Sequence, residues 1–145
     1  MLLHAFERLH ALNPSIHLYL LGDGSLRSSI KSYIKEKHLT KVVHLEGFVS
    51  DIDPYYTHAK SLVLTSWYEG WGLVAIEALT QKCPVIMTRV GLADTVVKDG
   101  VNGSVVSIND EDALLSAFHD VLSDSKRKQF VENIPKSLKI LPSEK

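Results

Sequence analysis

The sequence contains a single cysteine, Cys83, and has no long apolar run. One cysteine excludes an intramolecular disulfide and fits a reducing compartment. No stretch approaches the roughly 20 apolar residues that a membrane-spanning helix needs, and residues 1–8 do not follow the pattern of a signal peptide. We therefore expect a cytoplasmic protein that has at most peripheral contact with the inner face of the membrane.

The chain also lacks an excess of charge of either sign. Its 16 Lys and Arg residues and 17 Asp and Glu residues give a formal net charge of −1, so no strong field attracts nucleic acid or anionic lipid. The rest of the composition, 45% hydrophobic and 23% charged over 145 residues, is that of an ordinary globular protein. This length allows a sizeable core, and we expect residues 1–145 to form a single domain.

Histidine occurs in no pattern that is typical of a metal site. The seven histidines are His4, His10, His17, His38, His44, His58 and His119. None is spaced from another His, Cys or acid as metal ligands usually are, so we expect surface or half-buried histidines and no metal or other cofactor. Cys83 stands before Pro84 at the start of a predicted strand, which favours a small core residue over a nucleophile.

Short apolar runs alternate with segments of helical periodicity along the chain. The runs predict strands at 16–21, 42–45, 61–65, 84–88 and 104–108. Helices are predicted at 2–12, 25–39 (with Ser25 as N-cap), 52–60, 73–81 and 111–122 (with Asp110 near its start), and the tail of about 124–145 as helical up to Pro135 and then frayed. Apolar, β-branched strands that alternate with helices predict an α/β fold: a Rossmann-like parallel sheet with helices on both faces.

The first candidate motif is the turn Gly22-Asp23-Gly24, which follows a predicted strand and opens a predicted helix. With Glu46 at the end of the next strand, it imitates the fingerprint of a dinucleotide-binding domain. The third glycine is missing, because Arg27 stands where close helix–strand packing normally excludes a side chain. A tight strand-to-helix turn is the better interpretation, and a nicotinamide-dinucleotide domain stays open as an alternative.

The most informative segment joins a predicted strand to a predicted helix through two glycines, Gly70 and Gly72. Free amides and the positive dipole end at a helix N-terminus suit a diphosphate, and glycine lets the backbone approach it closely. Glu77, about one turn into the helix, is placed to accept hydrogen bonds from a ribose diol. Glu69, in the loop before the helix, is placed to meet a sugar on the far phosphate.

The run E-G-x-G-L-x-x-x-E-A, from Glu69 to Ala78, resembles the E-x7-E signature of retaining glycosyltransferase family 4, whose members share the two-domain GT-B fold. Further segments resemble this family along nearly the whole chain. They are Gly22-Asp23-Gly24, Gly47-Phe48-Val49-Ser50, Tyr56 with Ala59, Ser61 to Ser66, Gln81 to Ile86 with Lys82 where glycine is usual, and Asp99-Gly100-Val101-Asn102-Gly103.

The resemblance implies that the chain is the C-terminal, donor-binding half of such an enzyme, which transfers a hexosyl unit from a nucleotide sugar with retention to a glycan, lipid or other acceptor. It implies that Glu69 is the catalytic residue that contacts the donor sugar, and that Glu77 binds the ribose. The implied donor-binding residues are Gly22, Gly24, Phe48, Val49, Ser66, Gly70, Trp71, Gly72, Leu73, Val74 and Glu77, with the base near Phe48 and Val49. The aromatic residues that flank Glu69 are expected to pack around the loop, and a wall of the donor-sugar pocket is the alternative for Trp71.

Several departures from the family pattern limit what the chain is expected to do alone. The family's C-terminal domain opens with a central strand that ends in Gly-Arg, followed by a lysine, and no Arg or Lys here matches those two cations. The N-terminal partner domain, which carries much of the acceptor site, is also expected to be missing. Thr95, next to Asp94, stands where relatives often have glutamate. We expect the isolated chain to be inactive, and a non-catalytic nucleotide-sugar-binding module is the alternative.

Overall fold

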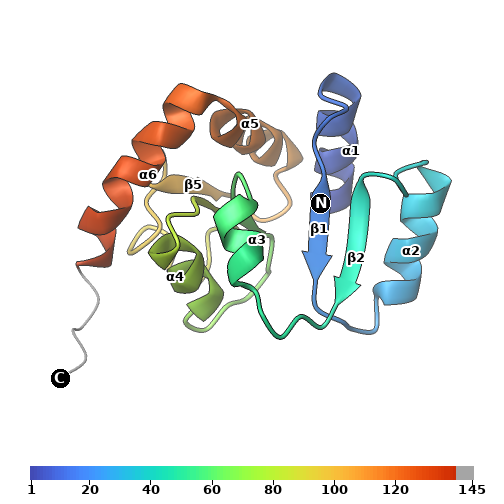
Figure 1. Cartoon of the computed structure of the whole chain (residues 1–145), viewed down its shortest axis with the longest axis horizontal. Helices are drawn as coiled ribbons and strands as arrows, with labels where there is room; N and C mark the ends of the chain where they lie inside the picture. Colours follow the sequence, from blue (N-terminus) through green and yellow to red (C-terminus); the bar gives the residue numbers. More distant parts are fainter. Residues whose placement is uncertain (140–145) are drawn as a thin grey trace. The chain divides into compact units, whose positions relative to one another are not determined.

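The computed structural model describes residues 1–139 (Figure 1). The elements follow in the order α1 (Leu2–Leu12), β1 (Leu18–Leu21), α2 (Arg27–Glu36), β2 (Val43–Gly47), α3 (Asp53–His58), β3 (Leu62–Leu64), α4 (Leu73–Thr80), β4 (Val85–Thr88), β5 (Gly103–Val106), α5 (Glu111–Leu122) and α6 (Asp124–Leu138). The chain divides into two compact units. We call Leu3–Ile52 the N-terminal unit, and the part from Asp53 onward, to which the first two residues also belong, the C-terminal unit.

The N-terminal unit is a pair of parallel strands with two helices. β1 pairs with β2, with Leu18 opposite Val43. The helical spacing of the apolar residues in α1 places Phe6 and Leu9 on one face, and both are buried. Ile34 of α2 is buried as well. The apolar stripes of the two helices therefore supply the core of this unit, as the periodicity of the sequence predicts.

The C-terminal unit contains a parallel sheet in the order β3-β4-β5. All four residues of β4 are buried, as are all four of β5. α5 contacts both of these strands, and α4 contacts β4 and α6. A strand buried on both faces explains why 85–88 reads as a continuous apolar run rather than an alternating one. The predicted α/β class with parallel strands is confirmed.

The strands of the described residues form two separate sheets rather than one. β1 pairs only with β2, and β3 pairs only with β4. The edge strand of a sheet carries backbone N–H and C=O groups that can form hydrogen bonds with a further strand.

The beginnings of two helices test the predicted capping residues. Asp110 caps α5, because its Oδ1 accepts a hydrogen bond from the amide of Ala113 at 2.9 Å. The prediction of Ser25 as the N-cap of α2 is wrong: the helix begins at Arg27, and Leu26 holds the cap position without a side-chain hydrogen bond. The amide of Arg27 instead bonds to the carbonyl of Gly24 at 3.1 Å, so a backbone turn satisfies that amide.

α6 continues through Pro135 to Leu138, whereas the sequence predicted that the helix would stop at the proline. Proline at this position removes the amide that would bond to the carbonyl of Val131. Ile134 and Ser137, on either side of it, are both buried. Their burial offsets the missing hydrogen bond and keeps the last turn helical. The frayed end that we expect beyond it lies outside the described residues.

The C-terminus of α4 holds a non-glycine residue in a backbone conformation that favours glycine. Lys82 has φ of 59°. Its amide bonds to the carbonyl of Leu79, and the amide of Cys83 bonds to the carbonyl of Ala78, both at 2.9 Å. This pair of hydrogen bonds is a Schellman motif, in which glycine is usual at the position of Lys82.

We predict that Lys82→Gly stabilises the chain by about 0.5–1 kcal/mol, because it removes the steric clash of a Cβ at positive φ. The gain is no larger because glycine has greater conformational entropy in the unfolded state. Urea unfolding measures the change. Lys82→Ala is the matched control, since it removes the charge and keeps the Cβ. Equal stabilisation by both variants would show that charge, and not backbone strain, is responsible.

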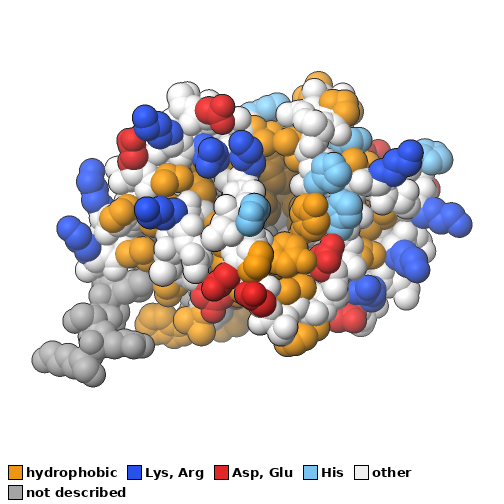
Figure 2. All heavy atoms as spheres, viewed as in Figure 1, with side chains coloured by type: hydrophobic (Ala, Val, Ile, Leu, Met, Phe, Trp, Pro, Cys, Tyr) orange, Lys and Arg blue, Asp and Glu red, His pale blue; other side chains and the backbone are white. Residues whose placement is uncertain are grey.

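Two histidines that the sequence did not place together form a hydrogen-bonded pair in the N-terminal unit. Nδ1 of His17 lies 2.9 Å from Nε2 of His44, and the ring of Tyr19 stacks on His44 with centroids 4.6 Å apart. Figure 2 shows histidine side chains close together over β1 and β2. Within residues 1–139, no three His, Cys, Asp or Glu side chains are grouped so that they could hold a metal ion. We interpret the two histidines as a polar surface contact.

Candidate functional site

The carboxyl ends of β3 and β4 lead into the two loops that form the candidate site. β3 runs into the segment from Thr65 to Gly72, which carries Glu69, and β4 runs into residues 89–97. β3 and β4 are parallel neighbours, so both loops leave the sheet at the same edge. Ligands of open parallel α/β sheets bind at this edge, beyond the carboxyl ends of the strands.

The amino end of α4 is open to an anion. Gly72 holds the N-cap position in the left-handed region, with φ of 58° and ψ of 47°, a conformation that glycine adopts without strain. Among the described residues, no side chain caps this end, and no acid lies in its first turn. The first amides of the helix and the positive end of its dipole therefore suit a phosphate group.

Large apolar side chains surround this end of α4 on the solvent side. Trp71 is 70% exposed and Leu73 is 64% exposed, and the preceding loop adds the exposed Trp67 and Tyr68. Exposed apolar side chains that are close in sequence, unlike singly scattered ones, mark a surface that contacts a ligand or another protein. Their exposure also shows that packing within the C-terminal unit does not explain why aromatic residues stand here.

Glu69 is held in place from two directions. Oγ of Ser66 donates to its Oε1 at 2.7 Å, and Oγ1 of Thr88, the last residue of β4, donates to the carbonyl of Ser66 at 2.5 Å. Gly91, at φ of 55°, packs so closely that a Cβ there would lie 3.0 Å from the Cβ of Glu69. The carboxylate is therefore fixed near the end of β4 by the hydroxyl of Ser66, whose backbone is held by Thr88, and by a glycine that leaves it room.

Glu77 lies five residues after the N-cap of α4, which corresponds to about 7.5 Å along the helix axis. This is a suitable span from a diphosphate at the helix end to the ribose attached to it. Glu77 is exposed, and its Oε2 lies 3.3 Å from the hydroxyl of Tyr56 in α3. The same hydroxyl is 3.3 Å from the carbonyl of Val74. Burial, followed by the charge of Glu77, raises the pKa of Tyr56 to about 12, so the phenol remains a donor.

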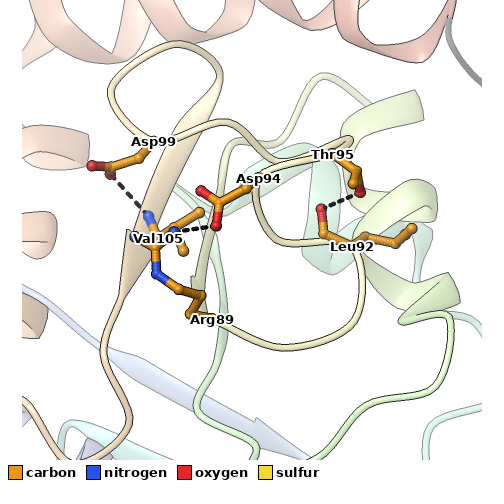
Figure 3. Close-up of polar contacts among 6 residues, drawn as sticks. All are labelled: Arg89, Leu92, Asp94, Thr95, Asp99 and Val105. Carbon is orange, nitrogen blue, oxygen red and sulfur yellow. Dashed lines mark hydrogen bonds and ion pairs between the residues drawn. The ribbon is translucent and has the colours of Figure 1, made fainter.

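The loop after β4 is held together by contacts within itself (Figure 3). The guanidinium of Arg89 forms an ion pair with Asp94. Oγ1 of Thr95, the residue at the family's glutamate position, donates to the carbonyl of Leu92 at 3.0 Å. Asp94 and Thr95, where the sequence departs from the family pattern, thus stabilise the conformation of the loop.

Residues 1–137 match the sequence model of the family described as Glycosyl transferases group 1. The chain belongs to this family. It is 29% identical over 124 residues to the lipopolysaccharide core biosynthesis glycosyltransferase LpsE of Rhizobium meliloti, covering 86% of this chain and 35% of that protein. The chain therefore spans about a third of the length of that relative.

Solved structures of glycosyltransferases share the fold. The C-terminal domain of a glycosyl transferase group 1 family protein from Francisella tularensis is 25% identical, with a TM-score of 0.82 over 94% of this chain and 74% of that one. A variant of TarM from S. aureus, in a complex that contains UDP, is 25% identical, with a TM-score of 0.83 over 94% of this chain and 28% of that one. The expected Rossmann-like half of a GT-B fold is confirmed.

Four residues that the family resemblance assigns to the donor lie in the N-terminal unit. Gly22 and Gly24 form an exposed turn, in which the amide of Gly22 bonds to the carbonyl of Gly47 at 2.6 Å. Phe48 directly follows β2 and is 87% exposed, whereas Val49 is half-buried. Their contribution to donor binding stays a prediction. The other predicted residues, from Ser66 to Glu77, all lie between the end of β3 and the first turns of α4.

Sequence reasoning missed the groups that hold the two glutamates. Thr88 ends β4 and Gly91 lies in the loop after it, both more than 18 residues beyond Glu69, and nothing in their spacing links them to it. Tyr56 was noted as part of a family segment, without a role. The signal that points to it is a tyrosine at a helix position that buries its ring, because a buried phenol requires a hydrogen-bond acceptor nearby.

Proposed function

We propose that this chain is the donor-binding part of a retaining glycosyltransferase, and that it holds a nucleoside-diphosphate sugar at the amino end of α4. One arrangement carries the proposal: an uncapped helix end lies between Glu69 and Glu77 along the chain, and each acid is anchored by a hydroxyl group, of Ser66 and Tyr56 respectively. The UDP present in the TarM complex is consistent with such a ligand.

The proposed roles follow from the chemistry of each group. The amides from Gly70 to Val74 hold the diphosphate, with Trp71 and Leu73 beside it and Ser66 fixing the loop. Glu77 accepts hydrogen bonds from the ribose diol. Glu69 accepts hydrogen bonds from the donor sugar and places its anomeric carbon for transfer of a hexosyl unit with retention. Gly22, Gly24, Phe48 and Val49 are proposed to meet the far part of the nucleotide, with the base near Phe48.

A nucleotide-binding module without catalysis is the second candidate, and one observation favours it. The segment from β3 through α4 contains no arginine or lysine, so it brings no cation to the leaving diphosphate, whose charge must be stabilised in the transition state. Supplying the acceptor domain of a relative separates the two candidates. Restored transfer of sugar supports the enzyme, and tight donor binding without transfer supports the module.

Partners and location follow from the same proposal. The acceptor site belongs to an N-terminal GT-B domain, and residues 1–145 act as the single donor-binding domain beside it. None of the helices over residues 1–139 is long and apolar enough to cross a membrane. A nucleotide-sugar donor is consistent with a cytoplasmic site of action and with peripheral contact at the inner membrane face.

The test is a thermal-shift titration with UDP, GDP, ADP and NAD. One nucleoside diphosphate at about 100 times its Kd stabilises the chain by about 2.7 kcal/mol, which raises the Tm by roughly 5–10 °C. NAD is expected to raise it less. A shift with NAD and none with the diphosphates would replace the proposal with a dinucleotide domain that uses the Gly22–Gly24 turn.

A further inference from the structure

Tyr56 is an unusual tyrosine because its side chain is buried while its hydroxyl faces a functional carboxylate. It lies in α3, is only 4% exposed, and reaches α4 with its hydroxyl. The oxygen is 3.3 Å from Oε2 of Glu77 and 3.3 Å from the carbonyl of Val74. A hydroxyl has one proton to donate, so these two acceptors share it.

Anchoring matters for Glu77 because an exposed glutamate on a helix surface is otherwise free to change rotamer. Fixing such a side chain costs conformational entropy. A hydrogen bond from the buried phenol already orders the carboxylate in the free protein, so less of this entropy is lost when a ligand binds. Only Oε2 takes part in the contact with Tyr56, so Oε1 remains available to accept a hydrogen bond from a ligand.

We propose that Tyr56 is a positioning residue, which orients the carboxylate of Glu77 toward the 2′- and 3′-hydroxyls of a bound nucleotide and so sets the preference for ribose. The inference rests on the proposed function, since it needs Glu77 to be the ribose acceptor. The inference goes beyond the proposed function because it gives α3 a role in recognising the ribose of the nucleotide. Glu69 has a parallel arrangement, in which Ser66 takes the same part.

The phenol keeps its proton under all ordinary conditions, because burial and the nearby carboxylate raise the pKa of Tyr56 to about 12. The hydroxyl therefore remains able to donate to Glu77 at neutral pH. The geometry thus predicts one constant role for the contact, and no switch with pH near neutrality.

The experiment measures the Kd of UDP and of 2′,3′-dideoxy-UDP by calorimetry for the wild type and for Tyr56→Phe. Loss of the hydroxyl is expected to weaken UDP binding about fivefold and to leave dideoxy-UDP binding unchanged, so the preference for ribose falls by the same factor. Tyr33→Phe is the matched control. It removes a 2.6 Å hydrogen bond from tyrosine to Glu7 in the N-terminal unit and is expected to leave both constants unchanged.

A role confined to packing predicts another result: both ligands weaken equally, or only the Tm falls. Either of these overturns the inference, as does an unchanged preference for ribose. In a Glu77→Gln background, Tyr56→Phe is expected to change the preference much less, because the charged acceptor is already gone. If the wild type binds UDP no better than dideoxy-UDP, the proposed function itself fails at Glu77, which distinguishes the two failures.

A second change keeps the inference testable if Tyr56→Phe does not fold. Fluorotyrosine at residue 56 keeps the ring and the hydroxyl but lowers the pKa of the phenol, which makes it a stronger hydrogen-bond donor. The preference for UDP over dideoxy-UDP is then expected to rise. A fluorotyrosine protein with the preference of the wild type would contradict the positioning role.

Discussion

Glu77→Ala is expected to weaken the binding of a nucleoside diphosphate by about 10- to 100-fold, which corresponds to about 1.4–2.8 kcal/mol. The carboxylate accepts hydrogen bonds from two ribose hydroxyls. Each hydrogen bond to a charged group contributes about 1.5–3 kcal/mol, and part of this gain is offset because water solvates the carboxylate in the free protein. Calorimetric titration with UDP measures the change. The exposed Glu132 of α6 provides the control, since Glu132→Ala removes one surface charge outside the site.

Glu69→Ala separates the two ends of the ligand. It is expected to leave the Kd of UDP almost unchanged and to weaken a UDP-sugar, because Glu69 addresses the sugar. Glu77→Ala is expected to weaken both ligands to the same extent. This crossover is specific to an arrangement in which the acids meet opposite ends of one molecule. Equal losses for Glu69→Ala with UDP and with the UDP-sugar would contradict it.

Asn102→Ala is expected to lower the free energy of unfolding by about 2–4 kcal/mol, and so the Tm by roughly 10 °C. Asn102 is fully buried. Its Oδ1 accepts from the amide of Lys98 at 2.7 Å, and its Nδ2 donates to the carbonyl of Val96 at 2.8 Å. Alanine leaves both backbone groups without their partner in a place that water does not reach.

Asn133→Ala is the matched control for this turn. Nδ2 of Asn133 donates to the carbonyl of Val101 at 3.2 Å and to that of Gln129 at 3.1 Å, in an exposed setting. Water replaces those contacts when the amide is removed, so its Tm is expected to change by only about 1–2 °C. Thermal unfolding followed by circular dichroism measures both variants. Similar losses for Asn102→Ala and Asn133→Ala would show that burial does not decide the effect.

The sequence was most informative where one local pattern determines the structure. The run at 84–88 predicted a strand without alternation, and β4 is buried over its whole length, because a strand covered on both faces needs no alternation. The Glu69–Glu77 segment was predicted to join a strand to a helix, and β3 and α4 lie as expected. Asp110 was predicted near the start of a helix, because the capping contact with Ala113 is local in sequence.

The sequence was less informative where the outcome depends on contacts between distant segments. The error at Ser25 is a local one, because a backbone turn from Gly24 starts α2 in place of the side-chain cap. Pro135 is a strong stop signal, which the burial of its neighbours in α6 overrides. Tyr56, which donates to Glu77, and Thr88, which holds the backbone of Ser66 beside Glu69, come from other elements, and their spacing in the sequence does not reveal these pairings.

The position of the diphosphate is the central claim, and a titration of the ¹⁵N-labelled chain with UDP tests it most directly. We expect the largest amide shifts at residues 70–74, with smaller changes at Glu77 and at Tyr56 behind it, because phosphate oxygens accept hydrogen bonds from the first amides of α4. Saturable shifts confined to the Gly22–Gly24 turn, with residues 70–74 unaffected, would contradict the account.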